Sequence, residues 1–285
     1  MIKDIDVEEI EMKLLTEAIF QNYGYDYREY SKASLLRRLR AYIIKKNKKN
    51  ISDLIPIILY NSNEFQELIS NISVTVTEMY RNPFVFKMIR EKIIPYLKTF
   101  PSVKIWVAGC ATGEEVYSLA IMLKEEGIYD KATIYATDIN KKSLIKAKDA
   151  VYSLENTKQN TKNYQKSGGK NSFSNYYTTK YNQVLLDNTL KENIVFLEHN
   201  LATDWSINQM HFIICRNVLI YFDKKLQNRV FSMFEESLFR GGFLCLGTKE
   251  TIMFSSVEDK FNTIGETEKI FQKKRKQHDK SKEND

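Results

Sequence analysis

The chain has 285 residues, of which 43% are hydrophobic and 28% charged, a composition typical of a folded globular protein with a buried core. No run reaches the roughly 18 apolar residues of a membrane-spanning helix, and the charged N-terminus lacks the apolar core of a signal peptide, so we expect a cytoplasmic protein. The formal net charge of +7 is concentrated between Arg28 and Lys49. This basic segment indicates either an acidic partner or a solvated helix face.

Residues 1–98 are predicted to form a helical domain that ends in a linker helix. Apolar side chains recur at helical spacing over Val7–Tyr23 and again over Arg28–Lys46. Two shorter helices are expected over Ser52–Tyr60 and Asn63–Ser70. Pro83 suits the first turn of a further helix, which the apolar pattern continues to Tyr96.

Residues 99–272 alternate between short β-rich runs and helical patterns. Strands are expected at Val103–Val107, Ala132–Ala136, Ile194–Leu197, Phe212–Cys215 and Phe243–Leu246. Helices are expected at Glu114–Glu126, Lys141–Ala150 and Lys224–Phe239. This alternation predicts an α/β, Rossmann-like, mostly parallel sheet with helices on both faces. The three cysteines lie far apart in apolar runs, which indicates buried thiols, with no disulfide and no metal site.

Two segments depart from this alternation. Residues 151–193 are predicted to be an insertion: 156–175, rich in Asn, Lys and Ser, is expected to be a mobile loop or linker, and Tyr176–Asp187 has strand-like spacing. Residues 273–285 are expected to form a basic, disordered tail.

The first strand leads into a glycine-containing turn that is a candidate cofactor site. Gly109 and Gly113 allow the backbone to approach a ligand closely, and their spacing differs from the G-x-G-x-x-G of NAD enzymes. Glu114 and Glu115 at the helix start oppose a phosphate and suit a cationic sulfonium. A tight strand-to-helix turn without a ligand is the alternative.

Polar residues follow three further strands, where ligands bind in open α/β sheets. Asp138 can accept hydrogen bonds from the ribose hydroxyls of an adenosine, or it caps the next helix. His199-Asn200-Leu201 follows another strand, although a single histidine there is more often a packing or surface residue. Asn217 could bind the amino-acid part of a cofactor and Tyr221 could orient a nucleophile, or Tyr221 is a core aromatic.

The motifs occur in a specific order. They read Ala-Thr-Gly-Glu-Glu-Val-Tyr-Ser (111–118), Ala-Thr-Asp-Ile (136–139), His-Asn-Leu (199–201) and Cys-Arg-Asn-Val-Leu-Ile-Tyr-Phe-Asp (215–223), after an upstream Thr-Val-Thr-Glu-Met-Tyr-Arg-Asn-Pro-Phe (75–84). Together they resemble the CheR family, the chemotaxis receptor glutamate methyltransferases, across about residues 10–272.

The resemblance implies a class I S-adenosylmethionine-dependent methyltransferase domain with a small inserted antiparallel β subdomain. It implies a cofactor site lined by Thr75, Thr77, Arg81, Glu115, Asp138, Asn200, Leu201, Arg216 and Asn217. It places Arg81 and Tyr221 beside the transferred methyl group as the catalytic pair. The acceptor would be a glutamate carboxylate, which is already ionised at neutral pH and needs no general base.

The sequence departs from the family pattern in ways that matter for partners. Thr75 stands where members often have Asn, and Gly-Thr-Lys-Glu (247–250) stands where Gly-His-Ser-Glu is common. The β subdomain lacks the glycine-containing loop with which some members grip a receptor's C-terminal peptide, so we predict docking without that tether. The basic helix, through Arg37, Arg38 and Arg40, is the expected docking surface for acidic chemoreceptors.

Two other classes of protein share features with this sequence. A nucleic-acid methyltransferase suits the +7 charge, but amino-directed enzymes carry Asp/Asn-Pro-Pro-Tyr/Phe where this chain has Arg-Asn-Val-Leu (216–219), so no nucleic acid is expected. A non-catalytic adaptor with a methyltransferase-like domain is motivated by the changes at Thr75 and Thr248.

Overall fold

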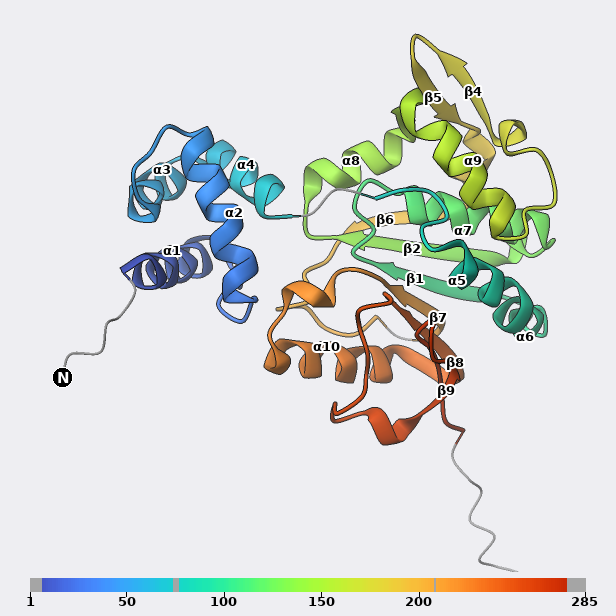
Figure 1. Cartoon of the computed structure of the whole chain (residues 1–285). Helices are drawn as coiled ribbons and strands as arrows, with labels where there is room; N and C mark the ends of the chain where they lie inside the picture. Colours follow the sequence, from blue (N-terminus) through green and yellow to red (C-terminus); the bar gives the residue numbers. More distant parts are fainter. Residues whose placement is uncertain (1–6, 74–76, 208, 276–285) are drawn as a thin grey trace, which may run out of the picture.

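A computed structural model describes residues 7–73, 77–207 and 209–275. The N-terminal part is a helical domain, at the left of Figure 1. Its helices are α1 (Val7–Tyr23), α2 (Lys32–Lys45), the short η1 (Ile51–Asp53), α3 (Leu54–Tyr60) and α4 (Ser62–Ile72). They bury one apolar cluster, which includes Leu15, Leu39 and Phe65. The helical spacing read from the sequence therefore predicted these helices, although α2 begins four residues later than expected.

The second domain, called the sheet domain below, is built on a seven-stranded sheet in the order β6-β2-β1-β7-β8-β10-β9. Its strands are β1 (Val103–Ala108), β2 (Ala132–Asp138), β6 (Ile194–Glu198), β7 (Met210–Cys215), β8 (Leu238–Leu246), β9 (Phe261–Gly265) and β10 (Ile270–Lys273). The pairs from β6 to β8 are parallel, and β10 runs antiparallel to both of its neighbours. The mostly parallel sheet is as predicted, whereas sequence reasoning missed β9 and β10.

Helices cover both faces of the sheet because alternate strand residues point to opposite sides. Ile105 and Val107 of β1 pack with α7 (Glu114–Glu125) and with α5 (Pro83–Met88) in one apolar cluster. Trp106 and Ala108 pack in a second cluster with α10 (Lys224–Ser237). The remaining helix of the central region, α8 (Lys141–Asp149), follows β2.

The linker helix is continuous but changes its winding. After α5 comes a π-helical segment, η2 (Ile89–Ile93), and then α6 (Ile94–Leu97). Pro95 has no N–H to donate to the turn before it, and a π segment is one way in which a helix accommodates such a residue.

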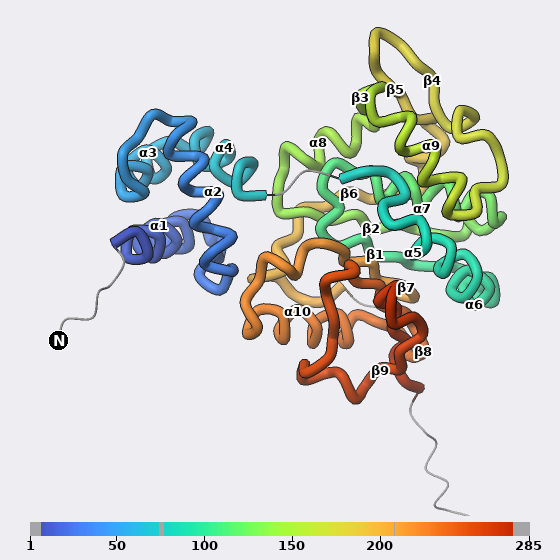
Figure 2. The backbone as a smooth tube through the Cα atoms, in the orientation of Figure 1, coloured from blue at the N-terminus to red at the C-terminus, as the bar shows by residue number. Residues whose placement is uncertain are grey.

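The insertion is an ordered subdomain, seen at the top of Figures 1 and 2. Strands β3 (Val151–Ser153), β4 (Tyr177–Lys180) and β5 (Gln183–Leu186) form an antiparallel sheet in the order β3-β5-β4, as expected. The prediction of a loop over 156–175 is wrong, because Thr157–Lys166 is a helix, α9. The buried face of α9 carries Asn160, Asn163 and Tyr164. The helix therefore packs through polar side chains that form hydrogen bonds, and it has no continuous apolar stripe.

Other expectations concern the cysteines and the tail. All three thiols are buried and unpaired, Cys215 and Cys245 in strands and Cys110 in the loop after β1. The predicted start of the disordered tail at Lys273 is wrong, because Lys273 ends β10 and pairs with Glu235. Lys274 N–H donates to the Lys260 carbonyl at 2.8 Å, and residues 276–285 lie outside the described residues. Among the described residues, no helix combines the length and apolar content that crossing a bilayer requires.

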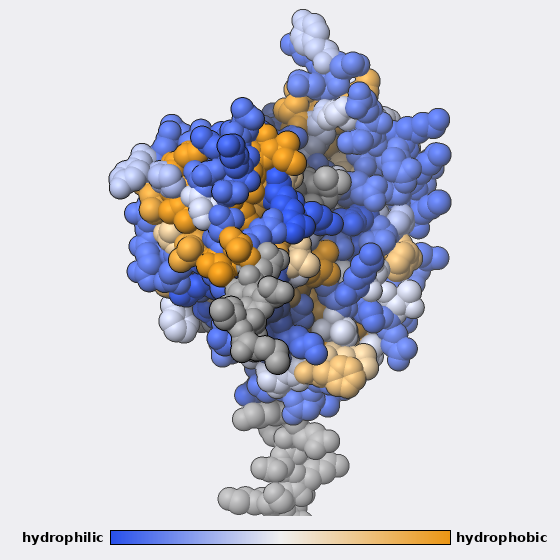
Figure 3. Space-filling view, turned by 60° about the vertical axis from the view of Figure 1, so that its left-hand side comes forward, coloured by the Kyte–Doolittle hydropathy of each residue, from blue (hydrophilic) through white to orange (hydrophobic). Residues whose placement is uncertain are grey.

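The helical domain is joined to the sheet domain by backbone contacts near Tyr30. Ser31 N–H donates to the Tyr221 carbonyl at 2.8 Å, and Asp223 N–H donates to the Glu29 carbonyl at 2.9 Å. The Tyr30 ring lies 4.9 Å from that of Phe222. Elsewhere the helical domain exposes apolar side chains (Figure 3), and large exposed ones along α1 are Val7, Ile10 and Leu14.

Candidate active site

A cavity of about 250 Å³ lies between β1 and β7, at the topological switch point where the strand order of the sheet reverses. Ligands bind at such switch points, outside the carboxyl ends of the strands. Most predicted site residues that the structure describes line this cavity: Thr77, Arg81, Gly109, Glu115, Asp138, Asn200, Leu201, Arg216, Asn217 and Tyr221. Gly113 and Glu114 of the candidate turn do not line it. Thr75 lies outside the described residues.

Gly109 is needed where β1 ends. Its φ of +73° lies in the left-handed region, and a Cβ at this position would meet the Val218 Cγ2 at 2.4 Å. The loops after β1 and β7 therefore touch across the switch point, which only a residue without a side chain permits. Gly113, with φ +93°, then leads into the first turn of α7 and places Glu115 beside the cavity.

Asp138 fastens the first loop to the end of β2. Its Oδ2 accepts a hydrogen bond from Ala111 N–H and its Oδ1 one from Asn140 N–H, each at 2.8 Å. The cap of α8 is Asn140, so Asp138 is not the helix cap. Burial raises the pKa of Asp138, although the backbone donors oppose the rise. Since a carboxylate has about four acceptor positions, Asp138 retains capacity for ligand hydroxyls.

Arg216 links three parts of the site. Its Nη1 is ion-paired with Glu115, and its Nη2 donates to the Arg81 carbonyl at 2.9 Å and to Asn82 Oδ1 at 2.8 Å. The side chain is only 2% exposed. The charge of the buried Arg216 is compensated by Glu115. The same guanidinium holds the loop that carries Arg81 against the sheet.

Glu250 supports the loop after β7, and sequence reasoning did not single it out. One carboxylate oxygen accepts N–H groups of Val218 (2.9 Å), Leu219 (2.7 Å) and Ile220 (3.3 Å). The other accepts those of Asn217 (3.0 Å) and Gly247 (2.6 Å). Burial raises the pKa of Glu250, and backbone donors that include Asn217, Gly247, Leu219 and Ile220 oppose that rise because they stabilise the ionised carboxylate. Its side chain thus shapes the loop that holds Asn217, whose φ is +62°. The available signal was its place in the Gly-Thr-Lys-Glu run.

The helical domain supplies one wall of the cavity, with Tyr27, Tyr30 and Arg38 among its lining residues. The guanidinium carbon of Arg38 lies 4.9 Å from the centre of the Tyr221 ring, a cation–π distance. Arg38 therefore lies at the cavity between the two domains and not on the exposed side of α2 with Arg37. Arg40 is ion-paired with Glu8, and Arg37 is exposed.

The cavity can be tested for its fit to S-adenosylmethionine through buried polar atoms. Among the described residues, three lining residues hold a buried polar atom without a hydrogen-bond partner: Tyr27 Oη, His199 Nδ1 and Arg216 Nε. His199 Nε2 lies 3.0 Å from the Trp205 carbonyl, which assigns its proton to Nε2 and leaves a lone pair on Nδ1. A ligand with hydroxyl donors and a carboxylate acceptor would satisfy all three atoms, and S-adenosylmethionine has both.

Comparison with known families agrees with this site. The model described as "CheR methyltransferase, SAM binding domain" matches residues 75–270, and "CheR methyltransferase, all-alpha domain" matches residues 10–73. A Pseudomonas putida protein designated Cher3 is 43% identical over 93% of this chain and 97% of its own length. The "Chemotaxis protein methyltransferase" of Borreliella burgdorferi is 30% identical over 87% of this chain and 90% of its own.

A solved structure gives a looser likeness. N-methyltransferase NodS from Bradyrhizobium japonicum, in complex with S-adenosyl-L-homocysteine, has a TM-score of 0.34 and 11% identity, covering 59% of this chain and 62% of its own. The family models and the curated relatives, rather than this likeness, identify the chain.

Proposed function

The chain belongs to the CheR methyltransferase family, and we propose that it methylates glutamate side-chain carboxylates in the cytoplasmic region of chemoreceptors, with S-adenosylmethionine as methyl donor. The products are a glutamate methyl ester and S-adenosylhomocysteine. The names of the curated relatives support chemotaxis as the context. The observation that carries the carboxylate acceptor is a cationic wall in the cavity.

This wall is formed by Arg38 and Arg81. Both line the cavity, and within the described part of the chain neither is ion-paired with an acid. Arg216, the third arginine of the cavity, is instead compensated by Glu115. The cavity also contains the acids Glu78 and Asp138, so the support comes from the two guanidinium groups themselves and not from net charge. Each can bind a carboxylate, because guanidinium matches carboxylate geometry.

S-adenosylmethionine, when bound, would supply an electrophilic methyl group to the carboxylate oxygen and would leave as S-adenosylhomocysteine. Because the acceptor is already ionised, the protein has no proton to remove. Arg38 and Tyr221 orient the carboxylate, and the Tyr27–Tyr30 side of the cavity excludes water. Glu115, Asp138, Asn200 and Asn217 would hold the cofactor. Arg81 holds either the acceptor carboxylate or that of the cofactor.

The test is methyl transfer to membranes that contain a chemoreceptor. Methyl-labelled S-adenosylmethionine should label the receptor, and mild base should release the label, since esters are hydrolysed and N-methyl groups are not. Arg81→Ala should lose transfer, while Lys87→Ala, an exposed cation on α5, should retain it. Retained binding of S-adenosylhomocysteine by Arg81→Ala in calorimetry would assign Arg81 to the acceptor carboxylate, and lost binding would assign it to the cofactor.

Two outcomes would contradict this function. Base-stable label would indicate a nitrogen acceptor, and no label on any receptor, with cofactor binding intact, would favour the adaptor alternative.

Docking of the receptor is a separate part of the proposal. The β4–β5 turn consists of Tyr181 and Asn182, both with positive φ, and contains no glycine. Docking without a receptor C-terminal peptide therefore stays our prediction, and Arg37 on the exposed side of α2 stays a candidate for steering acidic receptors. Calorimetry that detected tight binding of a receptor C-terminal pentapeptide would contradict it.

A further inference from the structure

Helix α9 of the inserted subdomain contacts the loop that carries Arg81, defined here as residues 77–82 and called the Arg81 loop. Asn160 Oδ1 accepts a hydrogen bond from Met79 N–H at 3.2 Å, and Asn163 Nδ2 donates to the Met79 carbonyl at 3.1 Å. Asn160 and Asn163 are 8% and 5% exposed. Both backbone polar groups of the buried Met79 are therefore satisfied by one helix from another part of the chain.

The Arg81 loop needs such support because its backbone is strained. Tyr80 and Asn82, on either side of Arg81, have φ values of +54° and +56°. Residues other than glycine adopt this left-handed region at a cost and keep it only where surrounding contacts impose it. Tyr80 is also held by its N–H bond to Ser118 Oγ at 2.9 Å and by its ring, 5.3 Å from that of Tyr164.

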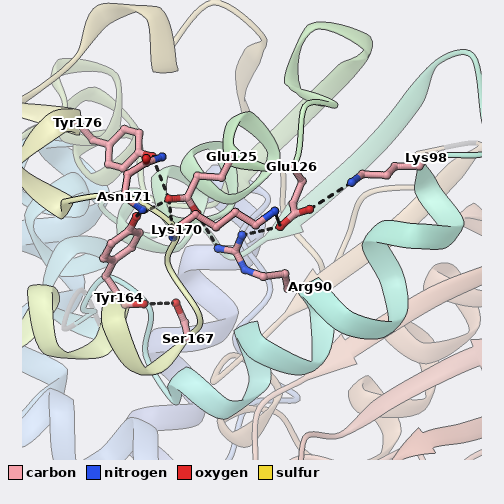
Figure 4. A network of polar contacts seen from close by, with 9 residues as sticks. All are labelled: Arg90, Lys98, Glu125, Glu126, Tyr164, Ser167, Lys170, Asn171 and Tyr176. Atoms are coloured by element: carbon pink, nitrogen blue, oxygen red, sulfur yellow. Dashed lines mark hydrogen bonds and ion pairs between the residues drawn. The ribbon is translucent and has the colours of Figure 1, made fainter.

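Helix α9 is itself fixed to α7 by a buried polar network (Figure 4). Glu125, whose side chain is 1% exposed, accepts hydrogen bonds from the hydroxyls of Tyr164 and Tyr176. Arg90 pairs with Glu125 and with Glu126, each at 2.7 Å. These contacts join α9, α7 and the linker helix, so α9 can act as a rigid support for the loop.

We propose that Asn160 and Asn163 are positioning residues for the methyl-transfer site, and that the inserted subdomain thereby sets the affinity for the cofactor. Met79 is two residues from both Thr77 and Arg81, which line the cavity. Freeing the Met79 peptide removes one restraint on the backbone between these two side chains, while Arg216 and Ser118 still hold the rest of the loop. The inference rests on the cofactor site of the proposed function and does not depend on which protein is methylated.

The test uses the full chain and S-adenosylhomocysteine as the calorimetric probe. Asn160→Ala and Asn163→Ala should each raise the Kd about tenfold, the effect of one buried hydrogen bond. The KM for S-adenosylmethionine should rise in parallel. Gln165→Ala, an exposed side chain on the same helix, should leave the Kd unchanged. Val184→Ala, in the core of the subdomain, should lower the unfolding temperature without raising the Kd.

Aspartate variants separate positioning from general destabilisation. Asn160→Asp keeps the acceptor for Met79 N–H and should bind S-adenosylhomocysteine more tightly than Asn160→Ala. Asn163→Asp removes the donor and should bind no better than Asn163→Ala. The proposal is overturned if the folded Ala variants bind within about twofold of wild type, or if Val184→Ala weakens binding as much as they do. Absence of receptor methylation by the wild-type protein, with normal cofactor binding, would instead contradict the proposed function and would leave this positioning role untouched.

Discussion

Replacing Glu250 with Gln should destabilise the protein and weaken cofactor binding together. The carboxylate accepts three N–H groups on one oxygen and two on the other. In the Gln variant, the amide oxygen can keep the three bonds from Val218, Leu219 and Ile220. The NH₂ group then faces the N–H groups of Asn217 and Gly247, and two donors cannot bond to each other. Two bonds to a charged group are then lost, at about 1.5–3 kcal/mol each, so we expect a loss of about 4 kcal/mol in the free energy of unfolding.

Thermal unfolding and calorimetry check this expectation. For a chain of this size, about 4 kcal/mol corresponds to a fall of roughly 10 °C in the unfolding temperature. The matched control is Glu258→Gln, because Glu258 accepts one backbone N–H, that of Phe254, at an exposed site. That variant should unfold within about 2 °C of wild type. A Glu250→Gln protein as stable as the control, with unchanged affinity for S-adenosylhomocysteine, would refute the view that this carboxylate shapes the loop.

Three further outcomes are expected. Burial raises the pKa of Glu114 from 4.5 to about 7, so ionisation of this carboxyl opposes folding. The free energy of unfolding should therefore fall by about 3 kcal/mol between pH 4.5 and 7. Urea unfolding of Glu114→Gln should show no such fall between these pH values. Gly109→Ala should abolish measurable cofactor binding through its clash with Val218, and adding Val218→Ala should restore part of it in calorimetry. Arg38→Ala should lower kcat/KM for receptor about tenfold at all salt concentrations, whereas the effect of Arg37→Ala should vanish by about 0.5 M salt.

The site residues at the strand ends could be predicted because the local sequence pattern shows where each strand ends. A β-rich run followed by a glycine turn or an acid identifies the carboxyl end of a parallel strand, and those ends meet at one edge of the sheet. Gly109, Asp138 and Asn217 were assigned to the site on this basis, and all three line the cavity. The wall from the helical domain, with Tyr27 and Tyr30, had no such signal because packing of two domains creates it.

The sequence prediction failed for α9 and did not place Arg38 at the cavity, because polar side chains occupy buried or half-buried positions of these helices. Helix α9 buries Asn160 and Asn163 through hydrogen bonds, so a search for apolar periodicity could not find it. Arg38 is three residues after Leu35 and four before Tyr42, both buried, and this spacing already places it near the buried face of α2. A cation at that position was a signal for a site between domains.

The Arg81 loop shows why a correct motif does not by itself give a working site. Its residues match the family pattern, but the conformation is imposed by partners distant in sequence: Arg216 lies 135 residues from Arg81, Ser118 lies 38 from Tyr80, and Asn163 lies 84 from Met79. Three elements thus fix two left-handed residues that would not hold this geometry alone. Changes in any of these supports should alter cofactor affinity while leaving every motif residue in place.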